Sequence, residues 1–370
     1  MISEEKIIIR PVTKNDKKII ILTVSKIFHF DVKSLELIWE WLFVNNPYIE
    51  GNYSDGWVMV KNDEIIGSIS FFPQLFNFNG NNNLLKFGSF FFISKEFRQP
   101  LNTFSFLNRF IKENNDYLFV GNTPINGITD LFKPFGSYTI KDYNNKNCYY
   151  LIRSDKVLIE WCNEKKFHNI GKSIIRIFIP FIKIVDIIRN KYFLTNKTYQ
   201  FSKCNQINDE FDILWEKLKN SYNILGVRNK KYLIWRYLKH PLGNIFLFSI
   251  RKNGLLVGYL AYSIRKRKNS DLMIFEVLDI FCDHKNGQLV NSISHWIIQK
   301  AKKTKSDIIK VSFLPKNLRD ELLKCGFINS STPNLDFIIF KNNSRHSDDY
   351  YCNENKWYLS SSDGDYTLGL

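Results

Sequence analysis

Four side chains that can accept a proton lie in or just after apolar stretches of the sequence. Glu96 follows a first apolar run, Glu276 and Asp279 lie in a second one, and His284 comes shortly after it. Carboxylates and imidazoles act as general bases when they are held within reach of the proton they remove. We therefore take Glu96 and Asp279 as candidate catalytic residues. The other two residues are further candidate bases.

Each of these residues also has a structural interpretation. Asp279 lies within an apolar stretch, so its carboxylate is either paired with a cation such as Arg236 or placed for function. Glu276 and Asp279 are three residues apart on a predicted strand, which predicts opposite faces of the sheet. Glu96 is more typical of a solvated turn residue than of a base, and His284 is more typical of an exposed histidine in a loop.

Arg228 and Arg236 are candidate substrate-binding residues. A guanidinium group forms two parallel hydrogen bonds to a phosphate or carboxylate, so these residues suit an anionic acceptor. The formal net charge of +16 favours anionic partners in general. Nucleic acid is the least favoured of them, because the sequence contains no helix-turn-helix, zinc-finger or RNA-recognition signature.

The cysteines predict neither a metal site nor a disulfide framework. They form no C-x-x-C pair and lie in no His/Cys cluster at metal-ligand spacing. The six are Cys148, Cys162, Cys204, Cys282, Cys325 and Cys352. This spacing favours reduced structural thiols and no bound metal. Charged residues precede the first short apolar run, so no signal peptide is predicted and we expect a cytoplasmic protein.

A strand, a helix and a second strand in residues 86–136 would position the candidate base Glu96. An apolar strand ending at Ile93 is followed by a turn, a helix over Leu101 to Lys112, a strand over Tyr117 to Val120 and a short helix ending at Gly136. Such a crossover puts a helix N-terminus beside strand ends, where anionic ligands bind. The stretch therefore predicts a site for a cofactor that carries phosphates.

The same order of elements occurs twice along the chain. Each half reads helix, helix, hairpin, long strand, helix, strand and helix, and Trp41 and Trp235 each lie six residues before a proline. A recurring order of this kind indicates a duplicated unit. We therefore predict an α/β (α+β) protein of two similar domains. Both tryptophans are expected in the core.

The predicted domains are residues 1–152 and 201–345. A basic amphipathic connecting region, 153–200, joins them, and an acidic tail, 346–370, follows. Residues 173–193 carry apolar side chains at helical spacing, but several charges and a proline interrupt them, so no membrane-spanning helix is predicted. This segment is either a packing helix or a peripheral contact with a membrane surface.

Several short segments follow the order of a known superfamily. Those of the first half are Ile66-Gly67, residues 91–98, Gly121-Asn122 and residues 133–136. Those of the second half are Arg228, Tyr232, Leu233, Trp235, Arg236, Tyr237, His240 and Pro241, with residues 357–359 and 363–365 at the end. The set resembles the GCN5-related N-acetyltransferases arranged as a tandem pair. The second-half set resembles bacterial two-domain members linked to surface polysaccharide synthesis.

The resemblance implies that each domain holds a mixed, mostly antiparallel sheet flanked by helices, and that the first half binds acyl-CoA. The implied cofactor-binding residues are Phe91, Phe92 and Ile93 on the long strand, Arg98, Gln99, Leu101, Asn102 and Thr103 in the turn beneath the pyrophosphate, and Asn122 after the next strand. The chain departs from the family pattern at Leu101 and Thr103, where glycine or a small residue is usual. Phe132 stands where a tyrosine often protonates the leaving thiolate.

The resemblance thus implies an N-acyltransferase that uses acetyl-CoA or another acyl-CoA and no metal. The expected acceptor is an anionic small molecule with an amine, such as an amino sugar of a cell-surface polysaccharide precursor. Two alternatives stay open. One is a catalytically inactive tandem protein for binding or assembly, and the other is a peptidoglycan-bridge-type transferase that uses aminoacyl-tRNA.

Overall fold

The computed structural model describes residues 7–49, 55–112, 118–120, 130, 132–140, 147–164, 179–181, 184, 198–330, 338–340 and 348–365. The chain forms two compact units. The first unit comprises Met1–Asn145, Lys219–Gly243 and Pro333–Leu370, and the second comprises Lys146–Leu218 and Asn244–Thr332. Most of residues 173–193, together with Tyr117 and Asn122, lie outside the described residues.

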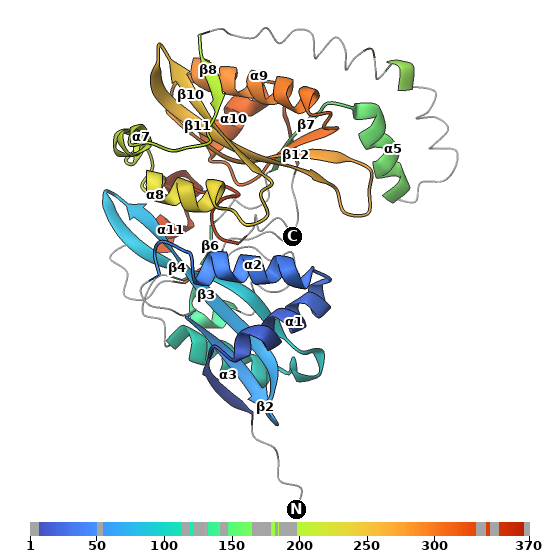
Figure 1. Cartoon of the computed structure of the whole chain (residues 1–370), viewed down its shortest axis with the longest axis vertical. Helices are drawn as coiled ribbons and strands as arrows, with labels where there is room; N and C mark the ends of the chain where they lie inside the picture. The colour runs from blue at the N-terminus through green and yellow to red at the C-terminus, as the bar shows by residue number, and fades with distance from the viewer. Residues whose placement is uncertain are drawn as a thin grey trace, which may run out of the picture. The chain divides into compact units, whose positions relative to one another are not determined.

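The first unit is built on a sheet whose strands run in the order β1-β2-β3-β4-β5-β15-β6, with β9 pairing both β3 and β16. Its elements are β1 (Ile8–Pro11), α1 (Asp16–Phe28), α2 (Val32–Phe43), β2 (Asp55–Lys61), β3 (Glu64–Phe78), β4 (Asn81–Ile93), η1 (Lys95–Phe97), α3 (Pro100–Lys112), β5 (Leu118–Val120), η2 (Lys133–Phe135), β6 (Ser137–Thr139), β9 (Ile224–Gly226), α8 (Lys230–Leu233), η3 (Ile234–Leu238), β15 (Ile338–Phe340), α11 (Asp348–Cys352), η4 (Glu354–Lys356) and β16 (Trp357–Tyr358). Figure 1 shows α1 and α2 side by side in this unit.

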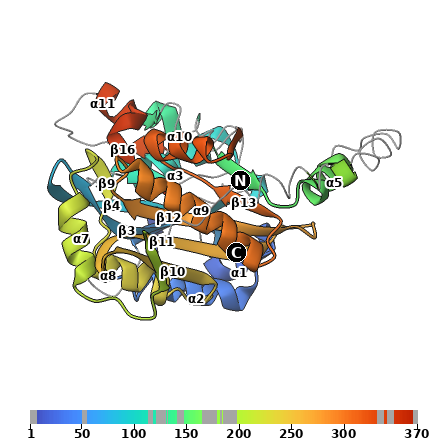
Figure 2. The same ribbon diagram turned by 90° about the horizontal axis from the view of Figure 1, so that it is seen from above.

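The second unit is built on a sheet in the order β14-β7-β13-β12-β11-β10-β8. Its elements are β7 (Asn147–Leu151), α5 (Ser154–Glu164), β8 (Gln200–Lys203), α7 (Glu210–Leu218), β10 (Ile245–Lys252), β11 (Leu255–Lys266), β12 (Met273–Cys282), α9 (Gly287–Lys303), β13 (Ile308–Val311), α10 (Lys316–Lys324) and β14 (Ile328–Ser330). In Figure 2, α9 lies across the strands of this sheet, where Trp296 packs on Phe248 with ring centroids 4.7 Å apart.

Both sheets are mixed and mostly antiparallel. Among the described strands, the parallel pairs are β4 with β5, β12 with β13, and β9 with β16. Two α+β units, each a mixed sheet with helices, confirm the predicted fold class. The predicted order of elements also recurs, since two strands, a long strand and a helix follow one another as β2-β3-β4-α3 and as β10-β11-β12-α9.

The two units repeat local irregularities as well. In each hairpin the register shifts at the same place, which leaves Ile66 of β3 and Val257 of β11 as extra residues. The glycine that follows allows close approach of the next strand. A Cβ would lie 3.3 Å from the Phe92 carbonyl oxygen at Gly67 and 2.8 Å from the Phe281 carbonyl oxygen at Gly258. The bulge or close backbone approach expected at a strand glycine is therefore present in both copies.

In each sheet, the strand that lies next to the shorter member of the long-strand parallel pair comes from the other half of the sequence. In the second unit, β7 lies between β13 and β14 and is antiparallel to both. In the first unit, β15 lies between β5 and β6 and is also antiparallel to both. The duplicated halves therefore exchange equivalent strands, and each sheet is completed only when both halves are present.

The exchange of β7 and β15 accounts for part of the difference between the compact units and the sequential domains 1–152 and 201–345. Residues 219–243 were expected in the second domain but belong to the first unit, and β7 was expected in the first domain but belongs to the second. The described part of the acidic tail 346–370 belongs to the first unit. Trp357 is 1% exposed and Asp363 is also 1% exposed, because this segment forms β16 and packs into the first unit.

Two helices cover one face of the first sheet, and their boundaries follow from local chemistry. The Asp31 side chain accepts a hydrogen bond of 2.8 Å from the Ser34 backbone N–H and so caps the start of α2. Apolar residues at helical spacing, Leu35, Ile38 and Leu42, are buried on its inner side.

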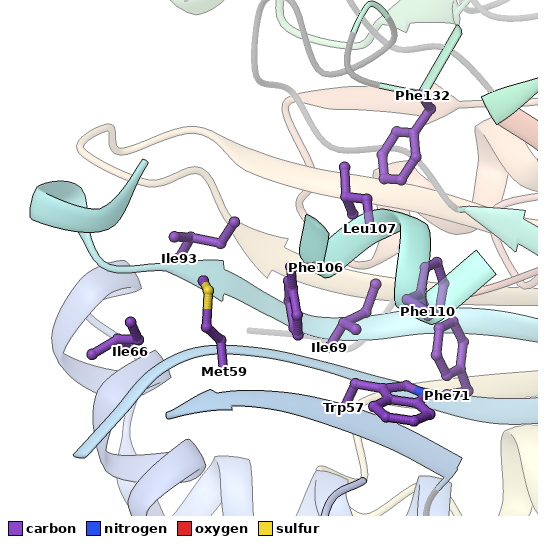
Figure 3. Packing of buried hydrophobic residues seen from close by; sticks show 10 residues of the cluster. All are labelled: Trp57, Met59, Ile66, Ile69, Phe71, Ile93, Phe106, Leu107, Phe110 and Phe132. Carbon is purple, nitrogen blue, oxygen red and sulfur yellow. The ribbon is translucent and has the colours of Figure 1, made fainter. Parts of the chain in front are cut away.

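The other face of the sheet packs against α3. Figure 3 shows Phe106 and Phe110 of this helix beside Ile69 and Phe71 of β3. The Phe71 and Phe110 rings are stacked with centroids 4.3 Å apart. This apolar contact holds α3 against β3, so the start of the helix is fixed relative to the end of β4.

The strand exchange predicts a large effect for one buried side chain. Tyr150 of β7 is fully buried, and its ring centroid lies 5.3 Å from that of Phe327, in the half that receives the strand. Replacing Tyr150 by alanine is expected to lower the free energy of unfolding by about 3–5 kcal/mol, measured by urea denaturation. The half-buried neighbour Tyr149, replaced in the same way, serves as the control. Equal losses for the two variants would contradict the assignment of β7 to this core.

Candidate functional site

The long strand β4 carries a bulge near its C-terminal end. Ser70 pairs with Ser89 and Ser68 pairs with Phe92, so Ile69 alone lies opposite two residues of β4. One of these two, Phe90, has a φ of 53°, which is in the left-handed region. A bulge interrupts the ladder and leaves backbone groups of the bulged strand without their regular partner. Such strained positions are concentrated at functional sites.

The bulge lies beyond the described pairing of β4 with β5. The two strands are paired at Lys86 with Leu118 and at Phe87 with Phe119. From Gly88 to Ile93, β4 has no partner in β5 among the described residues. The end of β4 therefore has one edge that the described part of β5 does not cover.

The turn after β4 leads directly into α3. Arg98 is exposed, and its Nε donates a hydrogen bond of 2.8 Å to the Ile93 carbonyl oxygen. The Thr103 N–H bonds the Gln99 carbonyl at 3.0 Å. The N–H groups of Leu101 and Asn102 lie in the first turn of the helix, which the helix ladder does not use. With the helix dipole, they form an end that favours an anion.

The structure brings most of the predicted cofactor residues together at this end of β4. Phe92 and Ile93 are buried, and Phe91 is partly buried against the core cluster. Leu101 is 74% exposed, whereas Thr103 is buried. The predicted base Glu96 lies in the turn η1 and is exposed, as its structural interpretation expected.

Phe132 is a core residue in this structure. It is 1% exposed and belongs to the apolar cluster with Leu107. An apolar ring therefore occupies the position where the resemblance expected a proton donor.

The second unit has an equivalent bulge and separation of strands. In β12 the register shifts at Leu278, and the pairing with β13 ends at Val277 with Val311. The bulge overturns the prediction that Glu276 and Asp279 face opposite sides. They pair with Ser263 and Ala261, which are two residues apart on β11 and so share one face.

The two carboxylates on that face have different partners. Glu276 accepts hydrogen bonds from Arg265 at 2.6 Å and from Lys310 at 3.0 Å. These cations outweigh the effect of burial and lower the pKa of Glu276. Asp279 is fully buried and accepts a hydrogen bond of 2.8 Å from Tyr259. The suggested partner, Arg236, binds main chain within the first unit.

In the second unit, side chains of the protein itself cap and flank the start of α9. The Asn286 side chain accepts a hydrogen bond of 3.1 Å from the Leu289 N–H. The Glu321 Oε2 atom lies 3.7 Å from the position that a Cβ would take at Gly287. His284 precedes this helix and is buried, and burial lowers its pKa. A capped helix start beside a carboxylate is a poor site for a phosphate.

Arg228 and Arg236 bind the C-terminal segment of the chain. Arg228 Nη2 forms a fully buried ion pair of 2.6 Å with Asp363. Arg236 Nη2 donates a hydrogen bond of 2.7 Å to the Gly364 carbonyl oxygen. Both side chains are 0% exposed. The guanidinium fork expected for an anionic acceptor is thus used, in this structure, to hold residues 363–364.

The tryptophans of the repeat form a reciprocal pair. Trp41 Nε1 donates to the Trp235 carbonyl oxygen and Trp235 Nε1 donates to the Trp41 carbonyl oxygen, each at 3.0 Å. The rings are stacked with centroids 4.9 Å apart, and Arg236 lies 5.1 Å from the centre of the Trp41 ring. Both tryptophans are buried, so the prediction that they are core residues is confirmed.

Sequence reasoning missed Asp365, which follows the residues held by the arginines. Its carboxylate hydrogen-bonds Ser89, the residue before the β4 bulge, and interacts with Arg236. Burial outweighs both partners and raises the pKa of Asp365 to about 6. Its sequence signal was the Asp-Gly-Asp at 363–365, in which the glycine has a φ of 76° and turns the chain.

Among the described residues, no helix is long and apolar enough to cross a membrane. Within the same residues, no three His, Cys, Asp or Glu side chains form a group that could hold a metal ion.

The buried ion pair predicts a loss of stability when one partner becomes neutral. Asp363→Asn leaves the Arg228 charge buried without its counter-ion, and we expect a loss of about 3–5 kcal/mol in urea denaturation. The pair of Lys133 with Asp130 has the same 2.6 Å separation but is exposed. Asp130→Asn is therefore the matched control, with an expected loss of about 0–1 kcal/mol. A comparable loss in both variants would contradict a special role for the buried pair.

No protein-family model and no curated protein sequence matches the chain. Solved structures do resemble it. The GCN5-related N-acetyltransferase of Anabaena variabilis ATCC 29413 superposes with a TM-score of 0.58 at 10% identity, over 90% of this chain and 72% of that one. Saccharomyces cerevisiae N-myristoyltransferase with bound myristoyl-CoA gives 0.57 at 12% identity, over 93% and 81%. A probable N-acyltransferase of Enterococcus faecalis V583 gives 0.54 at 10% identity, over 90% and 71%. The chain therefore has the fold shared by GCN5-related N-acetyltransferases and N-myristoyltransferases.

Proposed function

We propose that the protein transfers an acyl group from acyl-CoA to an amine, and that the site lies at the C-terminal end of β4. The observation that carries the proposal is the combination, in one unit, of a bulged strand, an edge that the described part of β5 leaves uncovered and a helix start beside it. The yeast N-myristoyltransferase structures, which share this fold, contain bound myristoyl-CoA. This supports acyl-CoA as the co-substrate class.

The residues of the first unit fit such a co-substrate. Backbone N–H groups around the bulge at Phe90 would hydrogen-bond the thioester carbonyl oxygen, where negative charge develops during attack. The amides of Leu101 and Asn102 and the exposed Arg98 guanidinium would hold the pyrophosphate. Since Phe132 is apolar and buried, the leaving thiolate would be protonated without a tyrosine at that position.

Two features of the sequence support the proposed acceptor class. The resemblance in residues 228–241 supports an amino sugar of a cell-surface polysaccharide precursor, and the net charge of +16 supports an anionic molecule. Acetyl-CoA is the proposed acyl donor because two of the structures with a similar fold are GCN5-related N-acetyltransferases. An inactive binding protein is the second candidate, and the observations that favour it are the exposed Leu101 side chain and the buried Phe132.

The two candidates are separated by acetyl-CoA binding and turnover. We expect acetyl-CoA at 100 times its Kd to stabilise the full chain by about 2.7 kcal/mol, seen as a rise in Tm. Titration calorimetry should give one molecule per chain, because the start of α9 is capped in the second unit. Binding together with release of CoA in the presence of amines supports the enzyme. The absence of both, with an intact fold, overturns it.

A charge substitution locates the site. Arg98→Ala should remove about 1 kcal/mol of acetyl-CoA binding, a roughly fivefold rise in Kd. Lys285→Ala changes the equivalent turn of the second unit and should leave the Kd unchanged. Lys14→Ala, at an exposed position that belongs to neither turn, controls for net charge. A larger effect of Lys285→Ala than of Arg98→Ala would place the acetyl-CoA site in the second unit and contradict the proposed site.

A further inference from the structure

Asp365 lies beside the β4 bulge although it is far away in the sequence. Its carboxylate hydrogen-bonds Ser89, and Ser89 directly precedes Phe90, the residue with the left-handed backbone. Phe90 itself packs against Trp39 of α2, with ring centroids 5.1 Å apart. Ser89 pairs with Ser70, and the neighbours of Ser70 in the sequence, Ile69 and Phe71, pack against α3 on the opposite face. Asp365 therefore belongs to the face of the sheet that α1 and α2 cover, next to the proposed site of acyl transfer.

The C-terminal segment is built to hold this position. Gln74 Nε2 donates a hydrogen bond of 2.9 Å to Asp363, and the Gly364 N–H bonds Gln74 Oε1 at 3.4 Å. At Gly364, with a φ of 76°, a Cβ would lie 3.1 Å from the Phe87 ring. Only glycine fits both the turn and the space. These contacts direct the next residue, Asp365, toward β4.

Two buried hydroxyl groups share this face. Ser70 pairs across the sheet with Ser89, and Ser68 is two residues before it on β3. Both serines are 0% exposed, and neither hydroxyl has a hydrogen-bond partner among the described residues. Leaving a buried polar group unsatisfied costs about 1–3 kcal/mol. Such groups beside a carboxylate point to a polar ligand that satisfies them when it binds.

The environment of Asp365 suits proton transfer at neutral pH. Burial raises its pKa to about 6, while Ser89 and Arg236 both act to lower it. On its own segment, Asp363 carries a charge that Arg228 already neutralises. A carboxylate with a pKa near the working pH combines the charged form with a useful basicity.

We propose that Asp365 is the general base that deprotonates the acceptor amine, and that Ser68, Ser70 and Ser89 line the subsite for this amine. The role rests on the proposed N-acyltransferase function. The acceptor enters as an ammonium ion, and Asp365 takes one proton from it. The neutral nitrogen then attacks the thioester carbonyl carbon, so that a C–N bond forms and the C–S bond breaks. The second proton lost by nitrogen goes to the CoA thiolate, and Asp365 returns its proton to solvent.

The main test compares two acceptors in the full chain. Glucosamine must lose a proton before it attacks, whereas hydroxylamine is a neutral nucleophile at pH 7. Asp365→Asn should lower kcat/KM for glucosamine by about 10²–10⁴-fold and for hydroxylamine by much less, with the acetyl-CoA Kd unchanged. Asp63→Asn, in an exposed hairpin turn of the same unit, is the matched control. Equal rates for the wild type and Asp365→Asn with glucosamine would overturn the role.

The pH dependence gives an independent readout. In the wild type, kcat/KM should rise with pH around 6 and then level off, and Asp365→Asn should lose this rise. A ¹³C NMR titration of the Asp365 carboxyl group, assigned with the variant, should give a pKa near 6 without any turnover. A pKa below about 4.5, as in an ordinary aspartate, would overturn the role even if the enzyme is active.

A stability measurement guards against misfolding of the variant. Because the pKa of Asp365 is raised in the folded state, its charged form destabilises the fold as pH rises from about 4 through 6. The Tm of Asp365→Asn should therefore be higher than that of the wild type at pH 7 and equal to it at pH 3. A lower Tm at pH 7 would assign Asp365 a structural role instead.

The outcomes separate this inference from the proposed function. A wild type that neither binds acetyl-CoA nor releases CoA overturns the function and this role with it. A wild type that acylates glucosamine while Asp365→Asn does so equally well overturns the role alone. If the wild type binds acetyl-CoA but acylates neither probe, the carboxyl titration decides for or against the subsite.

Discussion

The buried ion pair between Arg228 and Asp363 is the interaction on which the first unit depends most. Neither charge has access to water, so each is tolerated only because the other is present. The pair also dictates its surroundings. At Gly226, a Cβ would lie 2.2 Å from Arg228 Nη1 and 2.6 Å from Asp363 Oδ1, so no other residue fits there. Through this pair, the end of the chain is fixed against β9 and β3, and the position of Asp365 follows from it.

The duplicated halves have kept their backbone plan and changed their chemistry. Both long strands are bulged, and in both the described pairing with the parallel neighbour ends before the bulge. The helix starts differ, because Asn286 and Glu321 fill the one in the second unit, whereas α3 begins beside an exposed arginine. The side chains on the sheet face beside each bulge differ as well. One carries Glu276 with two cations, and the other carries serine hydroxyls and a carboxylate from the chain end.

Much of the architecture follows from local sequence patterns, because periodicity and turn residues are local signals. The order of elements, the hairpin glycines and the buried tryptophans were predicted in this way. The prediction that Glu276 and Asp279 lie on opposite faces of the sheet was wrong. Counting residues along a strand assumes a regular ladder, and a single extra residue reverses the face of every residue after it. The partner of Arg228 could not be predicted, since Asp363 is 135 residues away and its segment reads as a charged tail.

The exchange of strands has a consequence for synthesis on the ribosome. The gap between β5 and β6 is filled by β15, which begins at Ile338, so the first sheet stays incomplete while some 200 residues are added. At about 5–20 residues per second, this interval lasts roughly 10–40 s. During that time β5 has an open edge of the kind that pairs with other chains. The emergence of β15 closes this edge, so the exposure of β5 is confined to that interval.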